Sequence, residues 1–429
     1  MPRPGVLWPL PSTRRVCIIA SARLAHVARF LFKCEMTTPR SLTRRDFLGT
    51  TALAAVGAWR GLASPPLPGA LLFVGTYTEN GRREGVYLVR MNARTGELTQ
   101  VGAVDVGPNP SFLSIHPSGK TLYAVNEVEQ MSGKATGSVR AFAIDARDGG
   151  LALLGEQVSE GGAPCYVSAD RAGRYALVAN YVSGTVAVLP IRARGEIAKA
   201  SQVVQQSGTG PITDRQGGPH AHCIIPHPSN RFVLVADLGA DRVFVYGFDS
   251  KAGTLTHVPA SDAVMPPGTG PRHLAFHPKL PLLFVSGELN STVTALHCDA
   301  RSGALSAVQT LSTLPPNTAG TNFPADIHVS PDGRSLYVSN RGHNSVAVLS
   351  ISPSGALAFE QTVPTGGDWP RNFSLDPTNR WLLVANQRSN SVVVFARDEK
   401  SGRLTATNQR IELPSPVCVR FHAHRGAPA

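Results

Sequence analysis

A repeat of about 50 residues runs through most of the sequence, and it constrains the fold more than any other feature. A proline followed by a short strand-like run recurs seven times, at intervals of 54, 55, 52, 53, 46 and 46 residues. The seven prolines are Pro110, Pro164, Pro219, Pro271, Pro324, Pro370 and Pro416. A unit this short buries one face and exposes an edge, so each copy needs its neighbours for stability.

The units share one internal order of strands. In six of them a turn is followed nine residues later by the end of a second β-rich run, at Asn126, Asn180, Asp237, Gly287, Asn340 and Asn386. A third run follows, as in GTVAVLPI at residues 184–191, and a further turn usually opens a fourth. Seven units of four antiparallel strands predict an all-β chain folded as a seven-bladed β-propeller.

The two ends of the repeat region complete each other. Residues 70–103 contain the second, third and fourth strands of a blade with no first strand before them. Residues 416–421 (PVCVRF) form a first strand with nothing after it. Pairing the two removes both free edges, so we expect the C-terminal strand to complete the N-terminal blade and close the ring. The predicted propeller covers residues 70–424.

The segment before the repeats has the pattern of an export signal. The sequence SLTRRDFL at residues 41–48 places two arginines before a weakly apolar run, and GLA at 61–63 offers small residues for cleavage. We predict a twin-arginine export signal at 36–63, a linker at 64–69, and an over-extended start or a disordered leader at 1–35. The expected location is periplasmic or secreted through the twin-arginine export machinery, or cytoplasmic if the signal does not function.

Charge and hydropathy exclude two classes of partner. The chain has 41 Lys and Arg against 29 Asp and Glu. Residues 1–63 contain ten of the basic and two of the acidic residues, so the rest of the chain has a net charge of only +4. The remainder has no basic stripe with interleaved aromatic residues, so no nucleic-acid partner is predicted. The apolar run at 47–58 is too short to span a bilayer, so no integral membrane segment is expected. We expect a monomer.

The cysteines of the repeat region are scattered among different units. They are Cys165, Cys223, Cys298 and Cys418. No Cys-x-x-Cys pair and no dense framework of cysteines is present, so we expect small buried hydrophobes and predict no disulfide.

Polar residues interrupt the apolar pattern at two positions of the first strand. When the units are aligned on their turns, the interruptions are His222, Arg272, His273, Asp326, Arg371 and Asn372. The ends of the second strands carry Glu127, Glu288 and Arg341 beside the repeated asparagines. Since first and second strands are antiparallel, both sets should rim one mouth of the central channel, together with His220. Titratable groups that converge on a concave surface predict a binding site.

A structural role accounts for part of this pattern. The repeated asparagines favour side-chain to backbone hydrogen bonds that hold turns. Arg272 and Glu288 are also compatible with a structural ion pair inside one blade. A ring of such charges around one mouth still favours function.

Metal and covalent chemistry find little support in the motifs. His220 and His222 share one strand face, as metal ligands would, but the metallo-hydrolase pattern His-x-His-x-Asp-His is absent. The sequence has no Gly-x-Ser-x-Gly nucleophile elbow, no Gly-rich phosphate loop and no evident triad. We therefore predict no metal and no covalent intermediate.

Several segments together resemble a known family. They are GGPHAH (217–222), GTGPRHLAFHP (268–278), GELNSTV (287–293), ADIHVSPDGRSLYVSNRG (325–342) and WPRNF (369–373). In this order they look like the lactonase family of seven-bladed propellers, which contains 6-phosphogluconolactonases and the fungal 3-carboxymuconate lactonising enzyme. The resemblance covers about residues 70–424.

The resemblance implies a cleft enzyme that opens the lactone of a sugar acid without a cofactor. It places the catalytic residues at Glu288, Arg272, His222 and Arg341. The hypothesis is that Glu288 or His222 acts as general base toward water, and that Arg272 stabilises the oxyanion. In this scheme Arg341 with Arg371 holds an anionic substituent. The predicted substrate-binding residues are His220, His273, Asp326, Arg371, Asn372 and Glu127.

Two other functions stay open. The site could close a lactone on an unsaturated diacid, as a lactonising isomerase of the muconate type does. The chain could also be a non-catalytic exported propeller that binds partners, although such a module does not explain a charged rim on repeats three to six. Export further favours a lactone that is unphosphorylated or otherwise anionic, because the phosphorylated sugar lactone is made in the cytoplasm.

Overall fold

A computed structural model describes residues 69–78 and 81–422. All of them lie in one compact unit, residues 64–429. The predicted leader and export signal (1–35 and 36–63) and most of the predicted linker lie outside the described residues.

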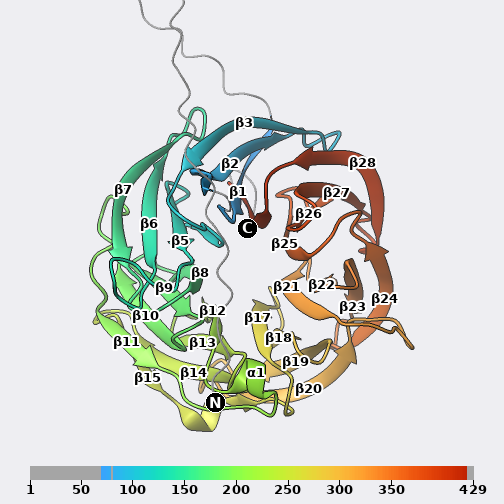
Figure 1. Cartoon of the computed structure of the whole chain (residues 1–429). Coiled ribbons are helices and arrows are strands. Elements are labelled where there is room, and N and C mark those ends of the chain that lie inside the picture. Colours follow the sequence, from blue (N-terminus) through green and yellow to red (C-terminus); the bar gives the residue numbers. More distant parts are fainter. Residues whose placement is uncertain (1–68, 79–80, 423–429) are drawn as a thin grey trace, which may run out of the picture. The chain divides into compact units, whose positions relative to one another are not determined.

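Seven antiparallel sheets form the blades of a propeller (Figure 1), so the predicted fold is confirmed. The first strands, which surround the axis, are β4 (Leu113–Ile115), β8 (Pro164–Ala169), β12 (Ala221–Pro226), β17 (Pro271–Phe276), β21 (Phe323–Val329), β25 (Pro370–Leu375) and β29 (Pro416–Phe421). The second strands are β5 (Thr121–Asn126), β9 (Tyr175–Asn180), β13 (Phe232–Asp237), β18 (Leu282–Gly287), β22 (Ser335–Arg341), β26 (Trp381–Asn386) and β1 (Ala70–Thr76).

The outer half of each blade follows the same order. The third strands are β6 (Ser138–Ile144), β10 (Thr185–Pro190), β14 (Arg242–Asp249), β19 (Thr292–Cys298), β23 (Ser345–Ile351), β27 (Ser391–Arg397) and β2 (Glu84–Met91). The fourth strands are β7 (Leu151–Val158), β11 (Gln202–Gln205), β15 (Thr254–His257), β20 (Leu305–Ser312), β24 (Leu357–Pro364), β28 (Leu404–Glu412) and β3 (Leu98–Asp105).

Some short elements of the described residues lie outside this plan. β16 (Ala263–Val264) pairs with β14 and gives that blade a fifth strand. The helix α1 (Thr213–Gln216) lies in the long connection between β11 and β12, and the 3-10 helix η2 (Pro259–Ser261) precedes β16.

The ring closes as the sequence predicts. The C-terminal strand β29 pairs antiparallel with β1, with Val419 opposite Val74 and Arg420 opposite Phe73. The blade in order β29-β1-β2-β3 therefore joins the two ends of the repeat region. This pairing leaves neither β1 nor β29 with a free edge toward the channel.

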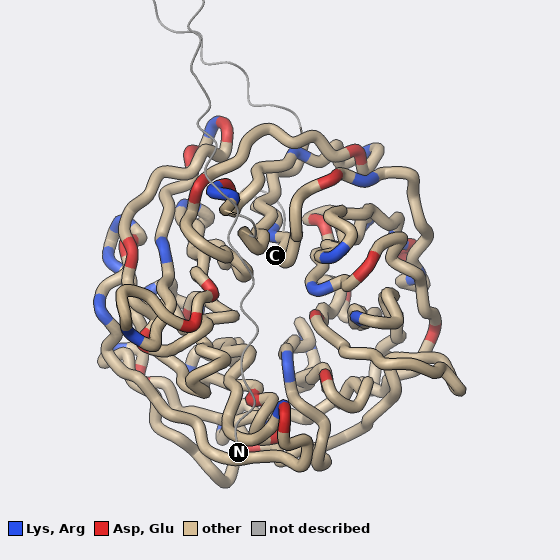
Figure 2. The backbone as a smooth tube through the Cα atoms, in the orientation of Figure 1, with Lys and Arg blue, Asp and Glu red and all other residues tan. Residues whose placement is uncertain are grey.

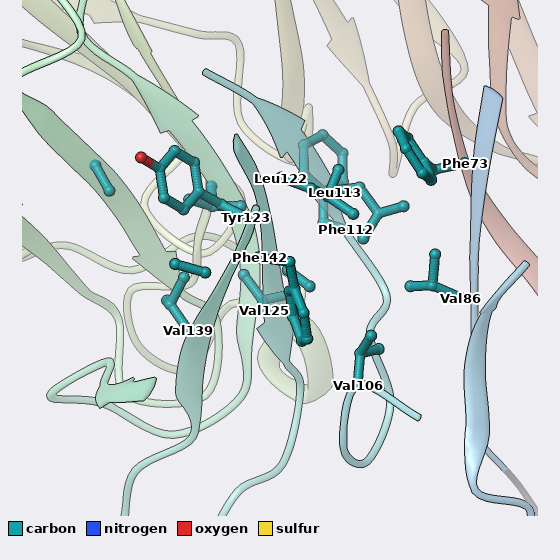
Figure 3. Close-up of a cluster of buried hydrophobic side chains, with 14 of the residues drawn as sticks. Phe73, Val86, Val106, Phe112, Leu113, Leu122, Tyr123, Val125, Val139 and Phe142 are labelled. Atoms are coloured by element: carbon teal, nitrogen blue, oxygen red, sulfur yellow. The ribbon is translucent and has the colours of Figure 1, made fainter. Parts of the chain in front are cut away.

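Burial explains why the strands differ in composition. Second strands such as β9 (YALVAN) are buried at every position, because both of their faces pack against neighbouring blades. Fourth strands such as β11 alternate between half-buried and exposed positions, because one face meets solvent. Figure 3 shows one layer between blades, where Phe73 and Val86 face Phe112, Leu113 and Phe142 of the next blade. Such layers form the core.

The repeated asparagines hold loops in place, as the structural reading of the sequence expects. Asn126 donates from Nδ2 to the carbonyl oxygens of Val106 (3.0 Å) and Pro108 (2.8 Å). The equivalent Asn180 donates to the carbonyl oxygen of Ser159 at 2.9 Å. Each amide thus ties the end of a second strand to the connection that arrives from the preceding blade.

Both signs of charge are interspersed around the rim of the propeller in Figure 2. The four described cysteines are all buried and free. Among the described residues, none of the helices is long and apolar enough to cross a membrane.

Candidate functional site

Side chains from six of the seven blades line one cavity at the end of the channel where the first strands begin. Its volume is about 190 Å³. The lining residues are Glu127, Cys165, Tyr181, Arg215, His222, Glu288, Arg341 and Arg371. The structure therefore brings together five residues that the sequence predicts for the site, namely Glu127, His222, Glu288, Arg341 and Arg371.

Irregular strand pairing presents the first-strand side chains to this cavity. The register between first and second strand shifts at Cys165 in β8, at His222 in β12 and at Arg371 in β25. Comparable shifts occur in β17 and β21. A bulge of this kind inserts an unpaired residue and changes the direction of its side chain. The second strands contribute at their ends, since Arg341 is the last residue of β22 and Glu288 directly follows β18.

Glu288 is the centre of an ion cluster. Its carboxylate lies 2.6 Å from Nη2 of Arg215, 2.9 Å from Nε of Arg272 and 2.6 Å from Nη2 of Arg341. Burial alone would raise the pKa of Glu288, but Arg341, Arg272 and Arg215 outweigh it and lower this pKa to about 2. Glu288 is therefore a buried carboxylate anion at neutral pH. The ion pair within one blade that the sequence allows is present, and two further arginines extend it.

Arg371 is held less tightly. Its Nη2 lies 3.9 Å from Oε1 of Glu127, and its guanidinium lies 5.4 Å from the centre of the Tyr77 ring. Glu127 in turn accepts a hydrogen bond from the Tyr77 hydroxyl at 3.0 Å. Among the described residues, no hydrogen bond engages the Arg371 guanidinium, so its donors are available to a bound anion or carbonyl oxygen.

His222 is a neutral imidazole in the cavity wall. Burial, together with the charges of Arg272 and Arg371, holds the pKa of His222 well below its usual range. Its Nδ1 is buried and has no hydrogen-bond partner among the described residues. Since Nδ1 is sealed from the cavity, a polar contact of this ring with a bound molecule must use Nε2. The ring is available as a proton acceptor at neutral pH.

Four other predicted residues lie beside the cavity rather than in its wall. Arg272, His273 and Asn372 line a small adjoining void of about 10 Å³, which shares Cys165 and Arg371 with the cavity. Asp326 is 3% exposed and is hydrogen bonded to His273. These side chains form a buried layer adjoining the cavity and do not line it.

His220 also stays outside the wall. Its ring stacks on Tyr181 with centroids 4.6 Å apart, and its Nδ1 lies 2.9 Å from the carbonyl oxygen of Tyr181. His220 and His222 thus occupy different environments. Within the described part of the chain, no group of three or more His, Cys, Asp or Glu side chains is placed to hold a metal ion.

Sequence reasoning missed Arg215 as part of the site. Arg215 lies on α1, in a connection that has no counterpart in the other repeats, so an alignment of the repeats does not reach it. The available signal was the long connection at residues 206–220, between β11 and β12, which contains this arginine. Cys165 and Tyr181 were in the aligned positions but, as a thiol and a phenol, did not stand out among charged neighbours.

The chain is similar in sequence to known β-propeller proteins. Residues 71–421 match the family described as "Lactonase, 7-bladed beta-propeller". A 6-phosphogluconolactonase of Bacillus subtilis (strain 168) is 36% identical over 350 residues, which cover 81% of this chain and 97% of that protein. A 6-phosphogluconolactonase of Formosa agariphila is 33% identical over 344 residues, covering 79% of this chain and 96% of that protein.

A solved structure extends the comparison to three dimensions. The periplasmic gluconolactonase of Pseudomonas aeruginosa superimposes with a TM-score of 0.77 and is 34% identical in sequence. The match covers 84% of this chain and 99% of that protein.

Proposed function

Since the chain belongs to the family of seven-bladed β-propeller lactonases, we propose that it hydrolyses the ring ester of a sugar-acid lactone in the cavity beside Glu288. The observation that carries the proposal is the cavity itself. It combines a neutral imidazole, a carboxylate anion and several guanidinium groups in a volume of about 190 Å³. This is smaller than the roughly 300–1,000 Å³ of pockets for drug-sized ligands, and it suits a single monosaccharide ring.

In the proposed reaction His222 is the general base. It accepts a proton from water while the hydroxide adds to the carbonyl carbon of the lactone. The tetrahedral intermediate then collapses, the ring C–O bond breaks, and the leaving alkoxide takes the proton back from His222. Water is consumed and a hydroxy acid is released. The lactone ring is already reactive, so orientation and modest proton transfer are enough.

Glu288 is assigned a supporting role instead of that of the base. Both of its oxygens are already engaged by guanidinium groups, Oε1 by Arg215 and Oε2 by Arg272 and Arg341, so neither is free to accept a proton from water. Its charge holds Arg215, Arg272 and Arg341 in place, and these guanidiniums stabilise the negative charge that develops on the carbonyl oxygen. Arg272 contributes from the layer beside the cavity, through its charge.

Arg371 is proposed to bind an anionic substituent of the substrate. Four guanidiniums (Arg215, Arg272, Arg341 and Arg371) face three carboxylates (Glu127, Glu288 and Asp326) in and beside this cavity, so the site carries a net positive charge. A positively charged site of small volume favours a substrate with a carboxylate or phosphate group. Neutral sugar lactones would bind more weakly.

The proposed location is periplasmic, after export through the twin-arginine machinery. The pattern at residues 36–63 supports this, and so does the similarity to a periplasmic gluconolactonase. A sugar-acid lactone that carries a further carboxylate instead of a phosphate fits both this compartment and the charge of the site. Replacement of both Arg44 and Arg45 by Lys in the full chain should leave the protein in the cytoplasmic fraction. Unchanged export of that variant would contradict the assignment.

Acid release by the purified full chain tests the reaction. Glucono-δ-lactone, 6-phosphogluconolactone and muconolactone should be compared, each against its spontaneous rate. We expect acceleration on at least one sugar lactone, and loss of it in the His222→Asn variant. Conversion of muconolactone alone would favour the isomerase. If no lactone is turned over, the proposed hydrolysis is wrong and the alternative of a non-catalytic propeller that binds partners is favoured.

A further inference from the structure

A chain of four hydrogen-bonded side chains lies directly behind the cavity. Nη1 of Arg272 lies 3.2 Å from Nε2 of His273, and Nδ1 of His273 lies 2.7 Å from Oδ1 of Asp326. On the far side, Nε2 of His328 lies 2.9 Å from Oδ2 of Asp326. Arg272, His273 and Asp326 are each less than 5% exposed, whereas the His328 side chain is 32% exposed. The chain therefore links the ion cluster of Glu288 to the more exposed side chain of His328.

The direction of each hydrogen bond in this chain is fixed. Burial would raise the pKa of Asp326, but the two neighbouring histidines hold it well below its usual range, so Asp326 is an anion and only accepts. His273 must then donate from Nδ1. Burial and the Arg272 charge lower the pKa of His273 to about 3, so the ring is neutral and its Nε2 carries a lone pair. Nε2 accepts from Arg272, which can only donate.

Asp326 cannot rotate away from this arrangement. Its Oδ1 also accepts from the backbone N–H of Ile327 at 3.1 Å. Its Oδ2 accepts from Nδ2 of Asn372 and from the backbone N–H of Phe373 at 3.3 Å. Asn372 is itself fixed, because its Oδ1 accepts from the backbone N–H of Val419 at 2.7 Å. Strands β17, β21, β25 and β29 thus all contribute to the position of one carboxylate.

The other charged and titratable groups near His273 do not disturb this assignment. His222 lies at 5.3 Å between ring centres, and Arg420 acts on His273 through its charge. Both Arg420 and Arg272 disfavour a protonated His273. The charges around the ring therefore favour the same neutral state that the hydrogen bonds require.

We propose that Asp326 and His273 are positioning residues, which fix the orientation of Arg272 by selecting the Nδ1–H tautomer of His273. With this tautomer Arg272 is held at two points, by His273 at Nη1 and by Glu288 at Nε. The Arg272 charge is then directed at the ion cluster and the cavity. The proposal rests on the proposed lactone hydrolysis for its effect on turnover, but the hydrogen-bond chain exists without it. Direct contact of these two residues with substrate is not part of this role.

The Asp326→Asn variant separates this role from simple packing, because it keeps the shape of the side chain. At the Oδ2 position an amide NH₂ would face the donors of Asn372, Phe373 and His328. At the Oδ1 position it would face Ile327 and His273, and His273 can adapt by moving its proton to Nε2. The Nε2–H of His273 would then face the N–H of Arg272, so two donors would meet and the hydrogen bond between these side chains would be lost. Selection of the wrong tautomer is known to reduce turnover strongly where geometry is otherwise intact.

Nitrogen-15 NMR of the imidazole rings in the full chain provides the readout. We expect the Nδ1–H tautomer for His273 in the unmodified protein and the Nε2–H tautomer in Asp326→Asn, with the signal assigned by its loss in His273→Asn. Rotation of the Arg272 guanidinium should be slow in the unmodified protein and faster in Asp326→Asn. Turnover by Asp326→Asn should fall about tenfold to hundredfold in kcat, with KM changed less than about twofold.

The His328→Gln variant is the matched control. Its amide can still donate to Asp326, so the His273 tautomer, the Arg272 signal and kcat should all stay as they were. An Nε2–H tautomer in the unmodified protein would overturn the proposal, and so would loss of kcat in Asp326→Asn with the His273 tautomer unchanged. If the unmodified protein hydrolyses no lactone, the proposed function fails, and the tautomer and the Arg272 signal still decide whether the positioning chain exists.

Discussion

Arg215 donates a hydrogen bond of 2.6 Å to the carboxylate of Glu288, although the two residues are 73 positions apart and only Glu288 belongs to the repeat. The side chain of Arg215 is 34% exposed and that of Glu288 is 5% exposed. An arginine from outside the repeat thus covers the solvent side of a buried anion. The same guanidinium lies 3.4 Å from the Tyr181 hydroxyl, so it also joins two blades across the cavity.

The Arg215→Ala variant should lose activity and keep its fold. Glu288 retains Arg272 and Arg341, and a partly exposed ion pair contributes less than about 1 kcal/mol to the free energy of unfolding. We expect kcat/KM for a lactone to fall about tenfold or more and Tm to change little. Arg194→Ala, in an exposed turn, is the control and should change neither quantity. Unchanged kcat/KM in Arg215→Ala would remove Arg215 from the site.

The Glu288→Gln variant should be poorly stable as well as inactive. Glutamine leaves the buried guanidiniums of Arg272 and Arg341 without a compensating charge. Breaking a buried pair in this way typically costs about 3–5 kcal/mol. We expect a clear drop in the midpoint of denaturant unfolding. Glu156→Gln breaks the half-buried pair with Arg140 (3.1 Å) and should cost less than about 1 kcal/mol. Equal effects of the two changes would argue against the ion cluster as a structural centre.

The Arg371→Gln variant tests the charge preference of the cavity. A charge-assisted hydrogen bond contributes about 1.5–3 kcal/mol, so kcat/KM for a lactone with a phosphate or carboxylate group should fall roughly tenfold to hundredfold. A neutral lactone, assayed with the same protein, should be affected much less. If both substrates lose the same factor, Arg371 instead acts on the carbonyl oxygen that all lactones share.

The fold could be predicted from the sequence because each blade repeats the same signals. The spacing from Pro271 to Gly287 within one unit and from Pro271 to Pro324 between units fixes the strands and their register. The unpaired strand at Pro416–Phe421 also determined how the ring closes. The short strand β16 has no such signal, since its two residues occur in one blade only.

The site could be predicted in part. Register placed Glu288, Arg341 and His222 at one end of the channel, where the structure has them around one cavity. The strand register does not show whether a side chain reaches the cavity wall or stays in the layer beside it. The two aligned positions differ in this respect, because successive side chains of a strand point to opposite sides. Asp326 therefore lies in the layer beside the cavity. Arg215 has no repeat partner, so only the structure connects it to Glu288.

A final prediction concerns pH and Asp237, which takes the place of the asparagine in its blade. Asp237 is fully buried, and its Oδ1 accepts from the backbone N–H of His220 (2.8 Å) and of Ala240 (2.9 Å). Its Oδ2 has no partner among the described residues. Burial raises the pKa of Asp237 to about 6, even though these N–H groups lower it. Folding therefore favours the protonated acid.

The sign of the effect follows from this raised pKa. The folded pKa of about 6 lies above that of an unfolded aspartate, about 3.9. The stabilisation by the protonated acid is complete below the unfolded value and is lost as pH rises through about 6. Ionisation in the folded state then costs roughly 2–3 kcal/mol at pH 8, given 1.36 kcal/mol per pKa unit. Asp237→Asn cannot ionise and avoids this cost.

We therefore expect Asp237→Asn to raise Tm relative to the unmodified protein by more at pH 8 than at pH 5. The reverse change in the neighbouring blade, Asn180→Asp, is the matched control. Asn180 donates from Nδ2 to the carbonyl oxygen of Ser159 and to Oγ1 of Thr185, and an ionised carboxylate would lose the first bond and face the Ser159 carbonyl oxygen without a hydrogen between them. Asn180→Asp should be less stable than the unmodified protein, and more so at pH 8. A Tm difference for Asp237→Asn that is the same at both pH values would mean that Asp237 does not titrate in this range.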